Sequence, residues 1–238
     1  AQAEVGGAEV ERDLAELRQI ALACERIDSG HYGECSDCGK AIDPRRLLAL
    51  HLGNGASLCA IRDGVSVATT MGYSPLDGLT MGARTGAIDG NAVLRLAEVY
   101  GIDGASRILN RDSGLLGLGG ASDMRALHAA QTPEARFAIA HFCYWAVRHA
   151  GSMIAAMGGL DAVAFTGGIG ENDALVRAEI MAGLDWTGLR FEAAAPPQNA
   201  ARLHSDASHV AVWVVPADEE RHIAAEALDL IRSAPSEG

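Results

Sequence analysis

The chain has one lysine, Lys40, among its 238 residues, and its net charge is −12 at pH 7. Lys40 does not stand in a G-x-x-x-x-G-K-[ST] sequence, so the chain lacks the lysine with which P-loop proteins hold phosphate. Any phosphate group would have to be held by backbone N–H groups, arginines or a metal ion. The shortage of positive charge also argues against binding to nucleic acid or to an anionic membrane surface.

The sequence also lacks a recognisable signal peptide, a membrane-length apolar run and an even number of cysteines. The most apolar long run, residues 138–157, is interrupted by His141, Arg148 and His149, which favours a buried helix over a membrane span. The cysteines are Cys24, Cys35, Cys38, Cys59 and Cys143. An odd number that includes a C-x2-C pair favours a reducing compartment and a metal site over disulfides. A cytoplasmic protein is therefore expected.

Residues 1–45 are predicted to form a helix and a small knuckle. Apolar residues from Val10 to Ile27 recur at spacings of three and four and so share one helix face, and Gly30 ends this pattern. The following turn-rich stretch contains the C-x2-C pair. A boundary is expected near Asp43-Pro44, with residues 46–238 forming a second, larger domain.

Three short apolar runs separated by two glycine-containing turns predict an antiparallel meander. The runs are residues 47–52, 56–61 and 65–70. The first turn, Gly53-Asn54-Gly55, has little side-chain bulk, so its backbone N–H groups could approach a phosphate closely.

Helices and strands then alternate as in an α/β protein. Helices are predicted over residues 89–100, 123–127, 134–157, 171–184 and 219–231, strands over 162–166 and 209–215, and a loop over 105–120. Ser122 is expected to cap the second of these helices and Pro133 to open the third. A glycine turn at 167–170, between a strand and a helix, is typical of an anion or nucleotide pocket, although a turn that only packs strand against helix has the same sequence.

Five blocks of the sequence resemble acetate kinases, in that family's order over roughly residues 46–232. They are HLGNGAS (51–57), the glycine-rich stretch MGYSPLDGLTMGARTG (71–86), SGLLG with SDMR (113–125), FTGGIGEN (165–172) and PADEE (216–220). The blocks cover only the C-terminal half of that family. The resemblance implies an α/β domain of the actin-like ATPase (ribonuclease H-like) type, with a mixed sheet flanked by helices. It also implies transfer of the γ-phosphoryl group of ATP to acetate, with magnesium, giving ADP and acetyl phosphate.

The resemblance assigns roles to individual residues. Arg84 matches the arginine that stabilises the transition state, although an arginine in such a loop can also serve only to tie the loop to a carboxylate. Phosphate contacts are expected from His51, Leu52, Gly53, Asn54 and Gly55, and contacts on the adenosine side from Asp123, Met124, Arg125, Gly168, Ile169, Gly170, Glu171 and Asn172. Glu219 matches the magnesium-coordinating glutamate, and Asp218 stands where the family usually has asparagine.

The stretch from Arg26 to Leu47 resembles part of the zinc finger of DksA/TraR regulators, which bind RNA polymerase. That family usually has a second C-x2-C pair, whereas here Cys59 falls at its last position and Ala56 at the other. Cys35 and Cys38 are therefore the main zinc candidates, and His31, His51 and, more weakly, Cys59 are the candidates to complete the site. The alternative is a knuckle with two free thiols.

The N-terminal half of the acetate kinase family supplies a second arginine, an aspartate and a histidine to the active site, and none has a matching motif here. We therefore expect the nucleotide-binding half of an acetate kinase-type phosphotransferase, poorly active or inactive alone, with nucleotide and a short-chain carboxylate as ligands. A separate N-terminal half, or a second copy in a homodimer, is the expected partner. The alternatives are a DksA/TraR-type binding protein and a fusion of two genes without a selected function.

Overall fold

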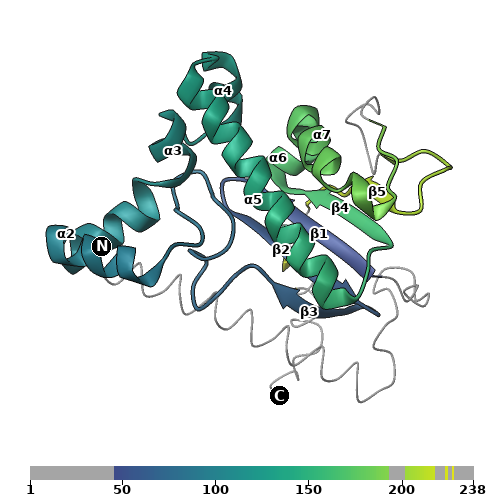
Figure 1. Cartoon of the computed structure of the whole chain (residues 1–238), viewed down its shortest axis with the longest axis horizontal. Coiled ribbons are helices and arrows are strands. Elements are labelled where there is room, and N and C mark those ends of the chain that lie inside the picture. The colour runs from purple at the N-terminus through teal and green to yellow at the C-terminus, as the bar shows by residue number, and fades with distance from the viewer. Residues whose placement is uncertain (1–45, 193–201, 218–222, 225–226, 228–238) are drawn as a thin grey trace, which may run out of the picture. The chain divides into compact units, whose positions relative to one another are not determined.

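The computed structural model describes residues 46–192, 202–217, 223–224 and 227. Five strands there form one sheet in the order β3-β2-β1-β4-β5 (Figure 1). The strands are β1 (Arg46–Leu52), β2 (Ala56–Arg62), β3 (Val65–Thr69), β4 (Ala162–Thr166) and β5 (Ala211–Val214). β4 runs parallel to both β1 and β5, whereas β1, β2 and β3 are neighbours joined by short turns, as antiparallel strands are. The predicted meander and mixed sheet are confirmed.

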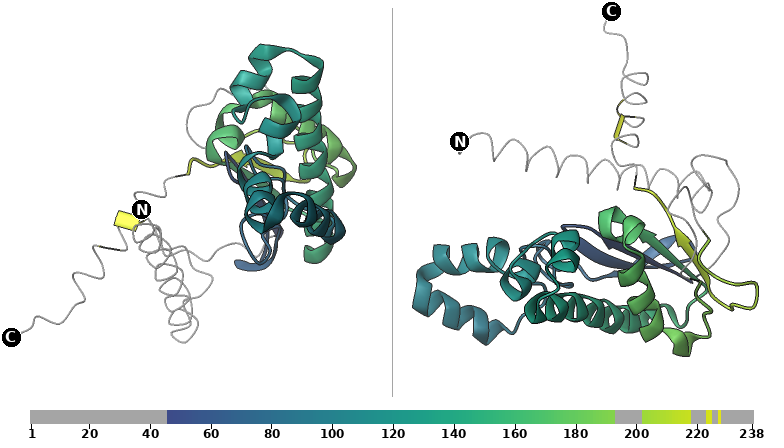
Figure 2. Two further views of the ribbon diagram at one scale, coloured as in Figure 1. Left: turned by 90° about the vertical axis from the view of Figure 1, so that its left-hand side faces the viewer. Right: turned by 90° about the horizontal axis from the view of Figure 1, so that it is seen from above.

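On β1 and β4, one face of this sheet is fully buried. Leu48 and Leu50 of β1 and their register partners on β4, Val163 and Phe165, have no exposed surface, while the residues between them are half-buried. Because successive strand residues point to opposite faces, these four side chains share one face. The long helix α5 (Pro133–Met157) packs along that face (Figure 2).

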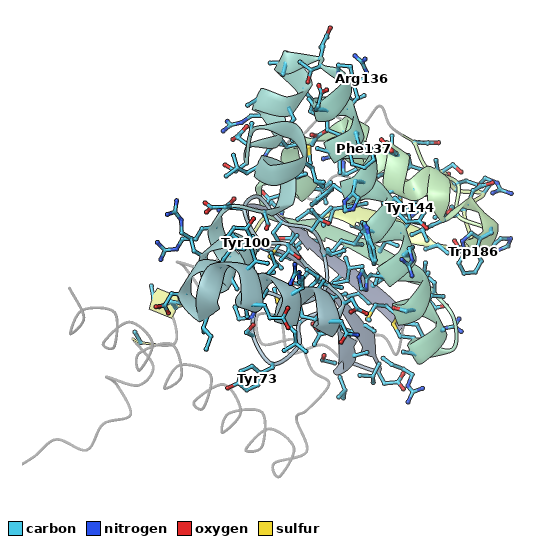
Figure 3. All side chains as sticks on the ribbon, turned by 60° about the vertical axis from the view of Figure 1, so that its left-hand side comes forward. Tyr73, Tyr100, Arg136, Phe137, Tyr144 and Trp186 are labelled. Carbon is cyan, nitrogen blue, oxygen red and sulfur yellow. The ribbon has the colours of Figure 1, made fainter. Side chains whose placement is uncertain are left out.

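Helix α5 forms as its sequence predicts. Pro133 occupies its first turn, and the Thr132 hydroxyl accepts a hydrogen bond from the Ala135 N–H at 3.1 Å. Buried residues follow at spacings of three and four along its inner face: Ala135, Ala138, Phe142, Ala146 and Ala150. Phe137 and Tyr144 are exposed on the remaining face of α5 (Figure 3). Small inner residues let this helix lie close to the sheet.

One prediction about the segment before α5 is confirmed and one was wrong. The helix predicted to end at Gly101 does so: within α2 (Gly90–Arg111) this glycine takes a φ of 74°, which separates one helix from the next. The predicted loop over residues 105–120 instead contains the end of α2 and all of α3 (Gly114–Gly119). Burial of Ala105, Leu109 and Leu115 accounts for the difference, because tertiary packing overrides a glycine-rich local sequence.

The helices around the glycine turn also begin elsewhere than predicted. Helix α4 (Met124–Ala130) is capped by Asp123 and not by Ser122. The predicted helix over residues 171–184 is two helices, α6 (Gly167–Asn172) and α7 (Ala174–Gly183), followed by the short 3₁₀ turn η1 (Asp185–Thr187). Asp173 separates the two because its carboxylate caps the N-terminus of α7.

Apart from Arg62 and Val65, the described residues of the sheet and its helices belong to one compact unit. The predicted N-terminal helix, the knuckle and the helix over residues 219–231 lie outside the described residues or almost entirely so, and the division after residue 45 stays a prediction. In the described part of the chain, no helix has the length and apolar character needed to cross a membrane.

Candidate functional site

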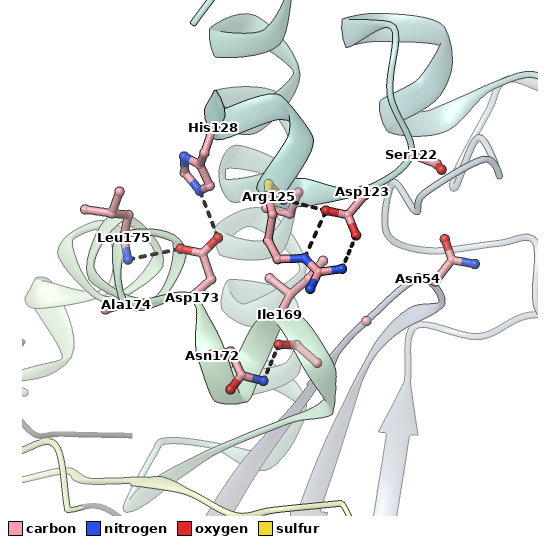
Figure 4. Close-up of a pocket in the computed structure, with 13 residues that line it drawn as sticks. Asn54, Ser122, Asp123, Arg125, His128, Ile169, Asn172, Asp173, Ala174 and Leu175 are labelled. Atoms are coloured by element: carbon pink, nitrogen blue, oxygen red, sulfur yellow. Dashed lines mark hydrogen bonds and ion pairs between the residues drawn. The ribbon is translucent and has the colours of Figure 1, made fainter. Parts of the chain in front are cut away.

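A cavity of about 900 Å³ lies where four separate segments meet (Figure 4). The segments are the turn between β1 and β2, the start of α4 with the residues before it, helix α6, and the start of α7. The lining residues are Gly53, Asn54, Ser122, Asp123, Met124, Arg125, His128, Gly168, Ile169, Asn172, Asp173, Ala174 and Leu175. A cavity of this size is in the range that holds cofactors and nucleotides.

Most of the residues singled out from the sequence line this cavity. Those that do are Gly53, Asn54, Asp123, Met124, Arg125, Gly168, Ile169 and Asn172, whereas His51, Leu52, Gly55, Gly170 and Glu171 lie beside or behind its wall. Sequence reasoning missed Ser122, His128, Asp173, Ala174 and Leu175. An aspartate directly before an apolar helical stretch is the one signal that could have marked Asp173, as an N-cap.

Backbone groups form one end of the cavity. The Gly53 N–H donates to the Gly55 carbonyl at 3.0 Å and so closes the turn. Gly167 has a φ of 79°, and a Cβ there would lie 2.8 Å from the Leu52 carbonyl oxygen, so only glycine lets α6 approach the end of β1 this closely. Helix α6 has only six residues, and the helix dipole expected from the sequence is correspondingly small. Backbone groups that a ligand can approach closely are therefore the main feature of this end of the cavity.

Glu171 acts here as a structural tie. Its Oε1 accepts hydrogen bonds from the Gly167 N–H at 3.0 Å and from the Ala217 N–H at 2.8 Å. The carboxylate thus joins the start of α6 to the chain that follows β5. Arg177, which is buried, donates from Nη1 to the carbonyls of Gly170 and Glu171, at 2.9 Å each, and burial lowers the pKa of its guanidinium. Together these bonds fix α6 against the sheet.

Arg84 lies beside the glycine turn. A Cβ on Gly55 would stand 2.8 Å from Arg84 Nη2, and Arg84 Nη1 donates to the carbonyl of Pro75 at 2.5 Å. The loop that carries Arg84 is held from two sides, because the Gly82 N–H donates to the Asn54 carbonyl at 3.0 Å and the Leu115 N–H donates to the Met81 carbonyl at 2.9 Å. The guanidinium is therefore near the cavity's backbone end, bonded to a carbonyl oxygen that it can exchange for another acceptor.

Asp123 and Arg125 form an exposed ion pair on the cavity wall. Arg125 Nη2 donates to Asp123 Oδ2 at 2.8 Å, and Asp123 Oδ1 also accepts from the backbone N–H groups of Arg125 and Ala126 at 2.8 and 3.2 Å. The hydrogen bond from the Arg125 side chain and those from the backbone lower the pKa of Asp123 to about 2.

This pair gives a testable titration. In the intact chain the Asp123 carboxyl should titrate with a pKa near 2, and in Arg125→Ala the pKa should rise toward its usual range, because the largest cause of the shift is removed. The side-chain carboxyl carbon can be followed by NMR as the pH is lowered. The depressed pKa means that any stability from the pair is present above the unfolded-state pKa and is lost as pH falls toward 2. An unchanged titration in Arg125→Ala would contradict the assignment.

His128 and Asp173 both line the cavity and contact each other through their side chains. His128 lies on α4, Asp173 precedes α7, and His128 Nε2 is 2.8 Å from Asp173 Oδ2. The other carboxylate oxygen of Asp173 accepts from the N–H groups of Leu175 and Val176 at 3.1 and 3.0 Å. Figure 4 shows this pair at the end of the cavity away from Asn54.

No metal cluster is found among the described residues: no three or more His, Cys, Asp or Glu side chains there are placed to hold one ion. Cys59 Sγ lies 3.1 Å from the Ser66 hydroxyl on the neighbouring strand. Cys35, Cys38 and Glu219 lie outside the described residues. The zinc and magnesium ligands inferred from the sequence stay predictions.

The chain matches the model of the acetokinase family over residues 35–225, which begins within the segment expected to form the knuckle. Acetate kinase from Methylocella silvestris is 46% identical over 189 residues, which make up 78% of this chain and 47% of that protein. The chain thus spans about half the length of the curated relatives that it matches.

Two solved structures share the fold. The crystal structure of Porphyromonas gingivalis acetate kinase matches with a TM-score of 0.76 and 33% identity, over 83% of this chain and 52% of that one. A propionate kinase from Francisella tularensis matches with a TM-score of 0.72 and 35% identity, over 77% and 49%. These similarities confirm the α/β fold class expected from the sequence.

Proposed function

The chain belongs to the acetokinase family, and from this we propose that it is the nucleotide-binding half of a kinase that transfers the γ-phosphoryl group of ATP to acetate or another short-chain carboxylate. One observation carries the proposal. Residues from three sequence blocks far apart in the chain, at Gly53, Asp123 and Gly168, converge on one cavity of about 900 Å³. These are the blocks in which the family's nucleotide contacts are expected.

In the proposed complex the triphosphate lies at the backbone end of the cavity. Asn54 and Gly168 line this end, and their backbone N–H groups and the Asn54 amide suit phosphate oxygens in a chain without a P-loop lysine, whereas the Gly53 N–H is bonded to the Gly55 carbonyl. The nucleoside lies toward α7, where Ile169 and Leu175 offer apolar contacts to its base. The residues that line the cavity therefore fit a nucleotide.

Arg84 is the proposed catalytic residue. Phosphoryl transfer spreads negative charge over the equatorial oxygens of the transferred group, and a guanidinium stabilises that charge with several hydrogen bonds. Its position beside Gly55, near the end of the cavity proposed to hold the phosphates, supports this role. Magnesium would neutralise further phosphate charge when bound, and Glu219 is its proposed ligand.

We propose that this chain alone is a weak catalyst or none. It covers about half of its curated relatives, and the groups that the family's other half contributes have no counterpart in its motifs. Loss of groups that stabilise developing charge costs orders of magnitude in rate. Nucleotide binding is therefore the property to test first.

Isothermal calorimetry with Mg-ATP tests the nucleotide site. The purified chain should bind close to one equivalent, and Gly168→Val should weaken binding about tenfold or more, because no heavy atom lies within 4 Å of the position of its Cβ and the added side chain enters the cavity. Gly151→Val, at an equally open position in α5, is the matched control and should bind normally. Absence of wild-type binding at millimolar nucleotide would refute the proposed function, and normal binding by Gly168→Val would refute the site.

A further inference from the structure

We propose that the hydrogen-bonded pair of His128 and Asp173 selects the base of the bound nucleotide and favours a 6-amino purine over a 6-oxo purine. The inference rests on the proposed function and extends it, since it names the feature of the substrate that the cavity recognises.

The Asp173 carboxylate is fixed by the helix that it caps. One oxygen accepts the N–H groups of Leu175 and Val176, which leaves the other oxygen directed at His128 Nε2, 2.8 Å away. The side chain of Asp173 is 13% exposed and that of His128 is 29% exposed, so both are largely withdrawn from water. The pair therefore has little freedom to rearrange.

This contact determines which nitrogen of the neutral imidazole carries the hydrogen. An ionised carboxylate only accepts hydrogen bonds, so His128 Nε2–H donates to Asp173, and Nδ1 remains as an acceptor. Among the hydrogen bonds of the described residues, none involves His128 Nδ1. Asp173 thus gives the cavity wall an acceptor of defined direction.

The place of the pair puts His128 at the nucleoside end of the proposed complex. Figure 4 shows Asn54 at one end of the cavity and His128, Ala174 and Leu175 at the other. With the phosphates at the backbone end, the base is left among the apolar side chains of Ile169 and Leu175, beside the imidazole. In the proposed complex the edge of the base that carries the 6-substituent faces His128 Nδ1.

The 6-position distinguishes the common purines. The exocyclic amine of adenine donates a hydrogen bond to a ring nitrogen, whereas the 6-oxo group of hypoxanthine or guanine is an acceptor. Two acceptors that face each other away from water leave both unpaired, at a cost that corresponds to about tenfold or more in affinity. Inosine triphosphate is the best probe, because it differs from ATP only in this part of the base.

The experiment compares Mg-ATP and Mg-ITP by calorimetry at pH 8 on the full chain and two variants. The wild-type chain should bind ATP about tenfold more tightly than ITP. In Asp173→Asn the amide oxygen still caps α7 while the amide nitrogen donates to His128 Nε2, so that Nδ1 carries the hydrogen and becomes a donor. The preference should then move toward ITP or reverse. His128→Leu should bind both nucleotides with equal affinity.

A merely structural pair would weaken both nucleotides together and leave their ratio unchanged. That result in both variants, or equal binding of ATP and ITP by the wild-type chain, overturns the inference and leaves the proposed function standing. If the wild-type chain binds neither nucleotide, both the proposed function and this inference are refuted. NMR of the imidazole nitrogens supplies a readout without nucleotide: Nε2 should carry the hydrogen in the wild-type chain and Nδ1 in Asp173→Asn.

Discussion

Replacing Arg84 with alanine should lower the rate of acetyl phosphate formation about 10²- to 10³-fold, which is the usual cost of removing one group that stabilises charge in a transition state. The affinity for ATP should change far less. Arg84 lies beside Gly55 at the edge of the cavity and is not among the residues that line it, so most of the nucleotide's contacts remain. A loss confined to the turnover rate identifies an interaction made chiefly in the transition state.

The rate can be measured by trapping acetyl phosphate with hydroxylamine. Because the chain alone is proposed to be a weak catalyst, it should be assayed mixed with the separately produced N-terminal half of the Methylocella silvestris enzyme. Arg84→Lys is the matched control: it keeps the charge but loses the planar set of donors, and its rate should fall between those of the wild type and the alanine variant. Equal rates for the wild-type chain and Arg84→Ala would remove Arg84 from the proposed mechanism.

Replacing Gly114 with alanine should destabilise the fold by about 3–5 kcal/mol, among the largest effects of any single substitution. Gly114 has a φ of 63°, and a Cβ there would lie 2.2 Å from the Met81 carbonyl oxygen and 2.6 Å from that of Arg84. Neither carbonyl can easily retreat, because the Leu115 N–H donates to the first and the Met81 N–H donates to the second. The substitution therefore also disturbs the loop that carries Arg84.

Urea unfolding followed by circular dichroism measures this loss. Gly151→Ala is the control, since its added methyl group has no neighbour within 4 Å and stands in the regular helix α5, where alanine should stabilise by about 0.5–1 kcal/mol. If Gly114→Ala lowers the free energy of unfolding by less than about 1 kcal/mol, the loop that carries Arg84 can move to accommodate the methyl group. The proposed positioning of Arg84 by α3 would then be wrong.

Elements with a local signal were predicted well from the sequence. The meander followed from two glycine turns between apolar runs, and α5 followed from Pro133 and its apolar spacing. Elements stabilised by contacts with residues distant in the sequence were missed. Helix α3 carries three glycines in six residues and no helix-forming pattern, and it forms because Leu115 is buried and its first N–H groups bond to the carbonyls of Met81 and Gly82.

The candidate site divides in the same way. The residues that the family resemblance supplied, such as Gly53 and Gly168, line the cavity, but their roles stay predictions. The contact between His128 and Asp173 spans 45 residues, and no spacing rule along the chain predicts it. The nucleotide contact assigned to Glu171 stays a prediction. What the sequence does not predict is that its carboxylate accepts from two backbone N–H groups, which the parallel pairing of β4 and β5 brings together.

The pairing of β1 with β4 also bears on how the chain folds during synthesis. Arg46 and Asp161 are bonded across a separation of 115 residues, and the register from Leu47 with Ala162 to His51 with Thr166 brings the two ends of that long segment together. Contacts this distant are slow to form, because the entropy of closing the segment is lost before the contacts are gained. A ribosome must therefore release most of the domain before the β1–β2 turn meets α6. The cavity, and with it the ability to bind a ligand, should therefore form late in folding.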